Sequence, residues 1–251
     1  MFGRGWRTRS PKNVVDEMEK LYNTYGESQF TFYDDAFTVN QERTTKFCEE
    51  LKNRKLNINW DCETRVDMVS PQLLQTMRDA GCMALWFGVE SGSQTILGKM
   101  NKKIKLDQTE EAFKAARKIG LMTIASTVIG FPGETEETAW ETINFIKKLN
   151  PDDIGFYVAT PYPGTPMYEL VKEKGWLRIT DFDRYDTATP TFETPWLTMD
   201  KIREIRYKAH QQFYLRPTYV LKMLARGGTY GTSAVKTSAA YFLRALHVKL
   251  S

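Results

Sequence analysis

Residues 127–137 read TVIGFPGETEE, an apolar run that passes through two glycines and a proline into an acidic run. The upstream segment, Leu121 to Ile129, is apolar and β-branched without sustained alternation, which is typical of a parallel strand covered on both faces. Downstream, Thr135 is placed to cap a helix whose first turn is acidic, as the helix dipole favours. The stretch therefore predicts a strand, a tight loop and a helix, and α/β folds bind ligands at such loops.

Four other segments have strand character, and each is followed by a helical segment. They are Gln29 to Asp34, Asn57 to Glu63, Met83 to Glu90 and Asp153 to Thr160. Helix starts are marked by Ser10-Pro11 and Ser70-Pro71, and helix ends by Gly26, Gly81 and Gly120. This alternation predicts an α/β fold with a parallel sheet, and the periodicity leaves open whether the sheet closes into a barrel.

All five predicted strands end in segments suited to a polar pocket. These ends are residues 33–37, 61–65, 88–92, 130–134 and 160–166, of which four supply carboxylates and three supply glycines. One such segment alone is more often a turn or a helix cap, but five on the same edge favour a ligand site. Carboxylates can accept hydrogen bonds from an ammonium group or a ribose diol, so we expect a ligand with positive charge and hydroxyls.

The composition excludes several classes of site. Three cysteines at Cys48, Cys62 and Cys82 form neither a disulfide framework nor a metal-binding spacing, and they suit a reducing compartment. The two histidines, His210 and His247, lie in the last fifth of the chain, which excludes histidine-based triads and metal sites; we expect both on helix surfaces. No apolar run could span a bilayer or serve as a signal peptide, so we expect a cytoplasmic protein.

The C-terminal part differs from the rest in charge. All 31 acidic residues lie at or before Glu204, and the eight Lys and Arg after it give the tail +8 against −4 for the body. Thr198 to Tyr214 predicts a helix, and Pro217 to Arg226 and Ala234 to Leu250 are basic and amphipathic. These two segments either pack on the rest of the protein or hold it peripherally at an anionic membrane, consistent with a lipid substrate. No nucleic-acid-binding motif accompanies them, so nucleic acid is not an expected partner.

Taken together, the motifs resemble those of the radical S-adenosylmethionine (SAM) superfamily, especially the branch often fused to a cobalamin-binding domain. The resemblance covers residues 1 to 174, and its order and spacing are specific although each motif alone is weak. The motifs are FGRGWRTRS (2–10), FYDDAFT (32–38), TRVD (64–67), FGVESGS (87–93), IGFPGET (129–135) and PYPGTP (161–166).

The resemblance implies a partial (β/α)6 TIM-like barrel in which strands 2–6 are present and the first is absent. It places Asp34 or Asp35 near the SAM amino group, Arg65 near its carboxylate, and Glu90 with Ser91 on the ribose side. The loop with Gly130, Gly133 and Glu134 resembles the wall against the adenine. An intact member would use a [4Fe–4S] cluster, reduced by a partner protein, to cleave SAM to a 5′-deoxyadenosyl radical that modifies a small-molecule or lipid substrate. Some members methylate with cobalamin.

The chain lacks the C-x3-C-x2-C motif that would hold this cluster, because its three cysteines are 14 and 20 residues apart. We expect each cysteine to be a small buried hydrophobe. The sequence is therefore interpreted as an N-terminally truncated core, residues 1–196, with a basic helical extension, residues 197–251, and this fragment is expected to be inactive.

Two alternatives stay open. One is a cluster-free module that binds SAM or a nucleoside without catalysis. The other is a barrel hydrolase or lyase that uses Asp34, Asp35, Glu90 and Glu134 as acid–base groups; it is disfavoured because no nucleophile–base pair or metal-ligand spacing accompanies them.

Overall fold

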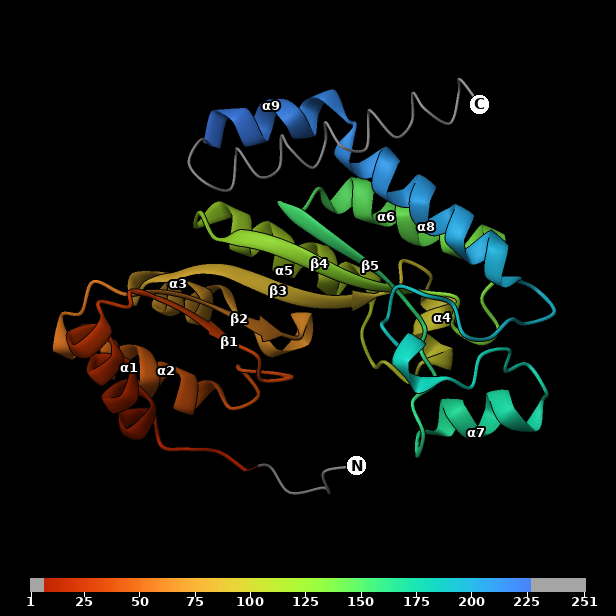
Figure 1. Cartoon of the computed structure of the whole chain (residues 1–251). Coiled ribbons are helices and arrows are strands. Elements are labelled where there is room, and N and C mark those ends of the chain that lie inside the picture. The colour runs from red at the N-terminus through yellow and green to blue at the C-terminus, as the bar shows by residue number, and fades with distance from the viewer. Residues whose placement is uncertain (1–6, 227–251) are drawn as a thin grey trace. The chain divides into compact units, whose positions relative to one another are not determined.

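The computed structural model describes residues 7–226, which form two compact units (Figure 1). Unit 1 contains the described residues up to Glu90 together with residues 103–126, and unit 2 contains residues 91–102 and the described residues from Thr127 on. The five strands are parallel and follow the order β1-β2-β3-β4-β5, with β4 (Met122–Ile129) passing from one unit into the other. The predicted α/β class with the strands of a partial barrel is confirmed.

Unit 1 alternates strands and helices in chain order. Its elements are α1 (Pro11–Tyr25), β1 (Gln29–Phe32), α2 (Gln41–Arg54), β2 (Asn59–Thr64), the 3-10 turn η1 (Val66–Met68), α3 (Pro71–Asp79), β3 (Cys82–Glu90), α5 (Leu106–Lys118) and the first part of β4. The predicted helix starts are confirmed, because the Ser10 and Ser70 hydroxyls accept the N–H groups of Asn13 and Leu73 and a proline follows each serine.

The sheet of unit 1 has two unlike faces. Along β2, Trp60, Cys62 and Thr64 are buried, whereas Asp61 and Glu63 between them are half-exposed. Trp60 packs edge-on against Phe47, with 5.2 Å between the ring centroids. Successive side chains of a strand point to opposite faces, so one face of the sheet joins the aromatic core and the other carries carboxylates.

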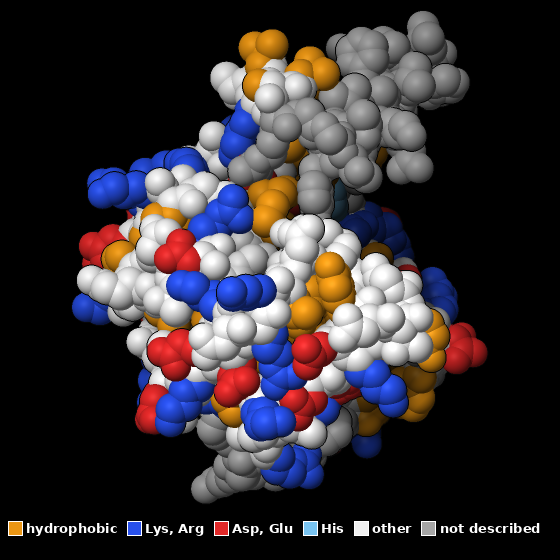
Figure 2. All heavy atoms as spheres, turned by 90° about the vertical axis from the view of Figure 1, so that its left-hand side faces the viewer, with side chains coloured by type: hydrophobic (Ala, Val, Ile, Leu, Met, Phe, Trp, Pro, Cys, Tyr) orange, Lys and Arg blue, Asp and Glu red, His pale blue; other side chains and the backbone are white. Residues whose placement is uncertain are grey.

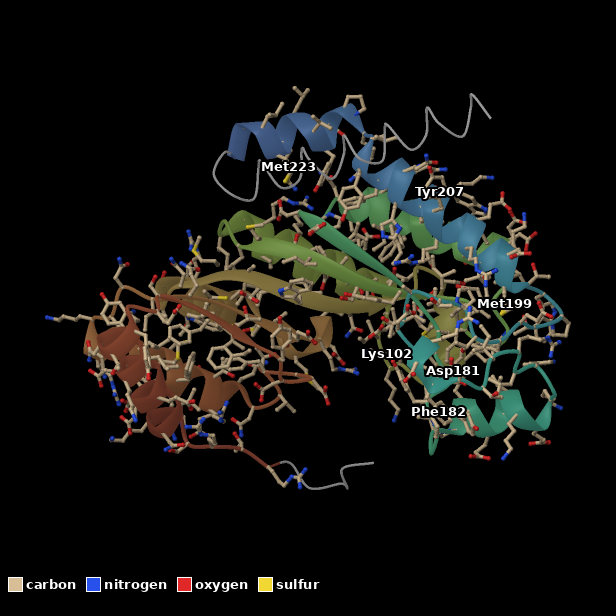
Figure 3. All side chains as sticks on the ribbon, viewed as in Figure 1. Lys102, Asp181, Phe182, Met199, Tyr207 and Met223 are labelled. Atoms are coloured by element: carbon tan, nitrogen blue, oxygen red, sulfur yellow. The ribbon has the colours of Figure 1, made fainter. Side chains whose placement is uncertain are left out.

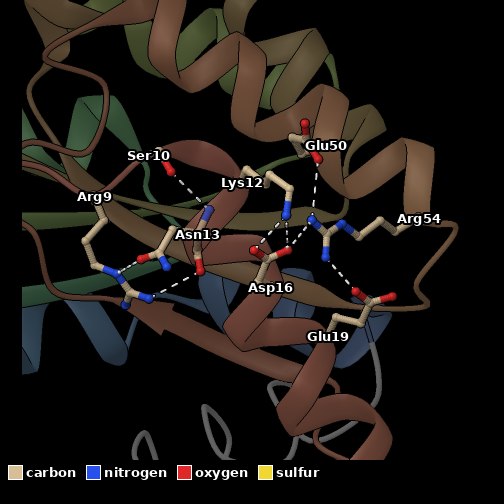
Figure 4. A network of polar contacts seen from close by, with 8 residues as sticks. All are labelled: Arg9, Ser10, Lys12, Asn13, Asp16, Glu19, Glu50 and Arg54. Carbon is tan, nitrogen blue, oxygen red and sulfur yellow. Dashed lines mark hydrogen bonds and ion pairs between the residues drawn. The ribbon is translucent and has the colours of Figure 1, made fainter.

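Helices α1 and α2 are joined by an ion-pair network centred on Arg54 (Figure 4). Its guanidinium lies 2.6 Å from Asp16, 2.5 Å from Glu19 and 3.5 Å from Glu50. The face of the molecule seen in Figure 2 shows acidic and basic side chains interspersed. The same two helices carry the exposed pairs Lys12–Asp16 and Lys46–Glu42. A surface of mixed charge carries no strong field of one sign.

Unit 2 contains α4 (Gln94–Lys99), the end of β4, α6 (Glu136–Leu149), β5 (Asp153–Val158), α7 (Pro166–Glu173), the 3-10 turn η2 (Phe182–Arg184), α8 (Met199–Tyr214) and α9 (Pro217–Arg226). Several backbone groups of β5 bond to partners other than a neighbouring strand's backbone. The N–H of Val158 donates to Thr187 O at 2.7 Å, and Arg206 Nε donates to Phe156 O, also at 2.7 Å. These bonds satisfy strand groups that would otherwise stay open to another chain.

The basic helix α9 packs on unit 2, as the first of the two alternatives predicted. Tyr219 and Met223 are each 2% exposed, and Met223 lies on the underside of α9 in Figure 3. The ammonium of Lys222 lies 2.8 Å from the carboxylate of Asp152, which is only 5% exposed. The face with Leu221 and Leu224 stays outward, and the predicted helix 234–250 lies outside the described residues.

Local sequence signals predicted the elements closely. All five strands lie within two residues of the predicted bounds, and the helix from Thr198 to Tyr214 is α8 with Thr198 as its cap. His210 differs from the expectation, because it is half-buried and its ring packs 5.1 Å from that of Phe156. Within residues 7–226, no helix is long and apolar enough to cross a membrane.

The Lys222–Asp152 pair gives a stability prediction. Replacing Lys222 by Met keeps the apolar stem but leaves the buried Asp152 carboxylate without its counter-charge, so the free energy of unfolding should fall by about 2 kcal/mol. Chemical denaturation measures this change. The control, Lys208→Met, removes an exposed partner of Glu204 and should have no measurable effect. Equal effects of the two variants would contradict the anchoring role of the pair.

Candidate functional site

Two carboxylates follow β1 in unit 1. Asp34 and Asp35 are exposed and lie in the turn between β1 and the buried Phe37. Burial lowers the pKa of Arg43, and the negative charge of Asp34 opposes this shift, so the two side chains are within electrostatic reach. The predicted pair is therefore placed at the carboxyl end of β1 with both carboxylates open to a ligand.

Arg65 follows β2 and is already part of a bidentate pair. Its Nε donates to Asp67 Oδ1 at 2.9 Å and its Nη2 donates to Asp67 Oδ2 at 2.8 Å. The hydrogen bond and charge of Asp67 raise the pKa of Arg65, and the charge of Glu90 adds to the increase. This geometry fixes the plane of the guanidinium and leaves Nη1 as the donor that a ligand carboxylate could use.

Glu90 ends β3 in a backbone conformation that is unusual for its type. Its φ is +62°, in the left-handed region that costs a side-chain-bearing residue about 1–2 kcal/mol. Such strain persists where the surroundings fix the chain, and it concentrates at functional sites. The conformation at Glu90 is thus an independent structural reason to keep it among the candidate residues.

The strand end 61–65, predicted to supply carboxylates to the pocket, carries polar groups that were not among the named cofactor-binding residues. Asp61 accepts hydrogen bonds from Thr31 Oγ1 at 3.0 Å and from Trp86 Nε1 at 3.1 Å. Burial raises the pKa of Glu63, and the charges of Asp35 and Asp61 raise it further. The alternation of polar and buried residues in β2 could have identified this face.

In unit 2, Ser91 is fully buried and its hydroxyl is already bonded. It lies 2.9 Å from Thr142 Oγ1 on α6 and accepts the N–H of Ser93 at 3.0 Å. The sequence placed Ser91 on the ribose side of a cofactor. In the structure its hydroxyl holds the segment that follows Glu90, and the ribose-side role stays a prediction.

The loop 130–134 after β4 is closed by its own side chain. The fully buried Glu134 accepts the N–H of Gly130 through Oε2 at 2.5 Å, and its own N–H donates to Phe131 O at 2.8 Å. Gly130 and Gly133 have φ of +87° and +88°, which glycine adopts without steric cost. Lys99 Nζ donates to Gly133 O at 2.7 Å, so the loop is held from α4 as well.

Burial raises the pKa of Glu134 to about 7, although the N–H groups of Gly130 and Phe131 oppose the shift. Its second oxygen, Oε1, has no hydrogen-bond partner among the described residues. One oxygen of this buried carboxyl therefore holds the loop through Gly130, whereas the other is buried without a hydrogen bond, which is costly for an ionised group. Near neutral pH, both the protonated and the ionised form of this carboxyl are therefore populated.

The cysteines do not form a metal site. Cys48, Cys62 and Cys82 are each buried, and desolvation raises their thiol pKa values, that of Cys48 to about 12. No group of three or more His, Cys, Asp or Glu in the described part of the chain could hold a metal ion. The expectation of buried, hydrophobe-like cysteines is confirmed, and these residues do not fit a [4Fe–4S] cluster.

Comparison with known proteins identifies relatives. The family model of the radical SAM superfamily matches residues 1–146. The chain is 36% identical, over 221 residues, to an uncharacterized methyltransferase of Pyrococcus horikoshii. This match covers 88% of the chain and 48% of the relative. It is 31% identical to the anaerobic magnesium-protoporphyrin IX monomethyl ester cyclase of Cereibacter sphaeroides, covering 86% of the chain and 36% of the relative. The chain thus spans about half or less of these proteins.

A solved structure shows the same fold. The radical SAM methyltransferase TsrM from Kitasatospora setae, with cobalamin and a [4Fe–4S] cluster bound, superposes with a TM-score of 0.61 and 21% identity. The match covers 69% of this chain and 36% of TsrM.

The buried Glu134 predicts a pH dependence. Its folded pKa of about 7 lies above the ordinary 4.5, so the folded state favours the proton, and this stabilisation is complete below pH 4.5 and lost as the pH rises through 7. Relative to Glu134→Gln, which does not titrate, the wild-type free energy of unfolding should fall by roughly 3 kcal/mol between pH 4.5 and pH 8.

Urea denaturation at several pH values measures this difference. Glu137→Gln is the matched control: Glu137 is exposed, and a side-chain hydrogen bond from Thr135 lowers its pKa, so its difference from wild type should stay constant above pH 5. A constant difference for Glu134→Gln as well would show that Glu134 is not buried in this way.

Proposed function

The chain belongs to the radical SAM superfamily, and we propose that it supplies the SAM-binding core of an enzyme that modifies a small-molecule substrate. The observation that carries the proposal is the closed 130–134 loop at the end of β4, with Glu134 bonded to Gly130 N–H. A loop so fixed offers a preformed wall, which lowers the entropy lost when a nucleoside binds.

Several polar groups of this loop already bond within the protein. An adenine would therefore meet mainly the backbone and the apolar surface of the loop. Glu134 is used in closing the loop, and the carbonyl oxygens of Phe131 and Gly133 accept hydrogen bonds from Glu134 N–H and Lys99. In this proposal Glu134 builds the wall, while Gly130 and Gly133 let the chain turn tightly enough to form it.

The carboxylates of unit 1 match the other parts of SAM by their chemistry. Asp34 and Asp35 are exposed acceptors for the amino group, and Glu90 is an acceptor for the ribose hydroxyls. Arg65, oriented by Asp67, would bind the carboxylate through Nη1. We assign these groups to one ligand because the motifs that carry them resemble those of the superfamily that the family model matches.

The cluster ligands would belong to a part of the parent protein other than residues 7–226, whose cysteines do not fit that role. When SAM and the cluster are bound together, they supply the radical chemistry, and the relatives favour methyl transfer or ring formation as its outcome. TsrM binds cobalamin, so a cobalamin-dependent parent is part of the proposal.

We also propose that the chain divides into a core, residues 1–196, and an extension, residues 197–251.

A cluster-free nucleoside-binding module remains the second candidate, because SAM binding alone needs none of the missing ligands. Both candidates require that the chain binds SAM. They differ in whether the full-length parent cleaves it, which anaerobic assay of the parent for 5′-deoxyadenosine would decide.

Calorimetric titration with SAM tests the binding that both candidates share. Glu90→Gly removes the carboxylate and relieves the strained backbone, so the variant should be at least as stable as wild type but bind SAM about tenfold more weakly or worse. Lys55→Gly is the control, because Lys55 has a similar φ of +54° but caps α2. Equal affinities of all three proteins, or no binding by wild type, would contradict the proposal.

We further propose a peripheral membrane contact through α9. Leu221 and Leu224 are 65% and 58% exposed on this helix, although Tyr219 and Met223 on its other side are buried. Two exposed leucines that are followed in the sequence by a basic segment suit insertion at an anionic lipid surface.

Sedimentation with vesicles tests this contact. Replacing Leu221 and Leu224 together by Gln should reduce pelleting with phosphatidylserine-containing vesicles severalfold, because apolar insertion is lost. Leu170→Gln changes an exposed leucine on α7 and should pellet like wild type. Equal pelleting of the double variant and wild type would rule the contact out.

A further inference from the structure

We propose that Thr142 on α6 is a positioning residue for the strand end that carries Glu90. Its hydroxyl fixes the backbone of Ser91 and Gly92, the two residues that follow Glu90 directly. The inference rests on the proposed SAM-binding function, since it assigns Thr142 the task of holding a ligand-binding side chain in place.

The hydrogen bonds around Thr142 form a complete set. Gly92 N–H donates to Thr142 Oγ1 at 2.9 Å, and the Ser91 hydroxyl lies 2.9 Å from the same oxygen. Thr142 Oγ1 donates to Thr138 O at 3.2 Å, and Ser93 N–H donates to Ser91 Oγ at 3.0 Å. When the Ser91 hydroxyl donates to Thr142 and the Thr142 hydroxyl donates to Thr138 O, each hydroxyl proton has one acceptor. The N–H groups of Gly92 and Ser93 are then bonded as well.

This arrangement differs from an ordinary threonine in a helix. A threonine that only bonds the carbonyl of the preceding turn satisfies itself and leaves the rest of the chain untouched. Thr142 also accepts from a backbone N–H fifty residues earlier in the sequence, at a site where both partners are buried. A buried N–H without an acceptor is costly, so the hydroxyl fixes where Gly92 can lie.

Gly92 makes the contact sterically feasible. A Cβ built on Gly92 would lie 2.5 Å from Phe145 Cβ, 2.7 Å from Thr142 Cα and 3.0 Å from Glu141 O. Only a residue without a side chain lets the backbone approach α6 closely enough for the hydrogen bond. The glycine and the threonine therefore form a matched pair.

The consequence reaches Glu90 through the chain. Glu90 has a left-handed φ, and such a conformation persists where neighbouring structure over-determines it. The bonded Ser91-Gly92-Ser93 segment is that structure on the C-terminal side. Ser91 accordingly acts with Thr142 in holding this turn, and it need not touch a ligand.

The test compares Thr142→Val, which keeps the shape but removes the hydroxyl, with Thr142→Ser, which keeps the hydroxyl. Thr109→Val is the control, because Thr109 is a buried helix threonine whose hydroxyl donates to Lys105 O of its own helix. Two quantities are measured: the exchange rates of the Gly92 and Ser93 amide hydrogens, and the dissociation constant for SAM.

We expect Thr142→Val to speed exchange at Gly92 and Ser93 about tenfold and to weaken SAM binding by a similar factor. Thr142→Ser and Thr109→Val should leave both quantities near the wild-type values. Should Thr142→Val not fold, Ser91→Ala removes the acceptor of the Ser93 N–H and the partner of the Thr142 hydroxyl, so it should speed exchange at Ser93 and weaken SAM binding.

Two outcomes would overturn the inference. One is unchanged exchange at Gly92 and Ser93 in Thr142→Val. The other is faster exchange with unchanged SAM affinity, which would make Thr142 structural only. If wild type does not bind SAM at all, the proposed function fails and the positioning role falls with it, whereas the exchange rates still report whether Thr142 holds the turn.

Discussion

The buried contact between Glu134 and the N–H of Gly130 is the constraint on which the proposed site depends most. An apolar strand that ends inside a protein must satisfy the polar backbone groups of the loop that follows it. Here the chain supplies a carboxyl four residues later, and the two glycines allow the turn that brings it back. These hydrogen bonds close the loop on itself, and the acidic first turn of α6 follows directly.

A second constraint acts in unit 1, where the sheet separates apolar from acidic side chains with a period of two. Trp60 and Cys62 join the aromatic core, while Asp61 and Glu63 face the opposite side with Trp86. Cys62 and Cys82 belong to the first face and Cys48 lies on α2, and burial raises the thiol pKa of all three. The carboxylates belong to the second, near the strand ends where Asp34, Asp35 and Glu90 lie.

Sequence reasoning predicted what is encoded locally. Proline after serine, glycine after a helix and runs of β-branched residues placed every strand and most helix ends, because these signals act within a few residues. It did not predict that Ser91 and Glu134 are used to build their own loops, since that depends on packing. Thr142 carries no local signal at all, because its partners Ser91 and Gly92 lie far away in the sequence. The carboxylates at the end of β2 were predicted to lie at the pocket, but the contacts of Asp61 with Thr31 and Trp86 come from neighbouring strands and carry no local signal.

A crystal structure of the chain with SAM would test the central claim most directly. The account predicts the adenine against the backbone of the 130–134 loop, the ribose hydroxyls on Glu90, and the methionine carboxylate on Nη1 of Arg65. Density for SAM away from these groups, or a loop that rearranges so that Glu134 releases Gly130 to bind the ligand, would contradict it.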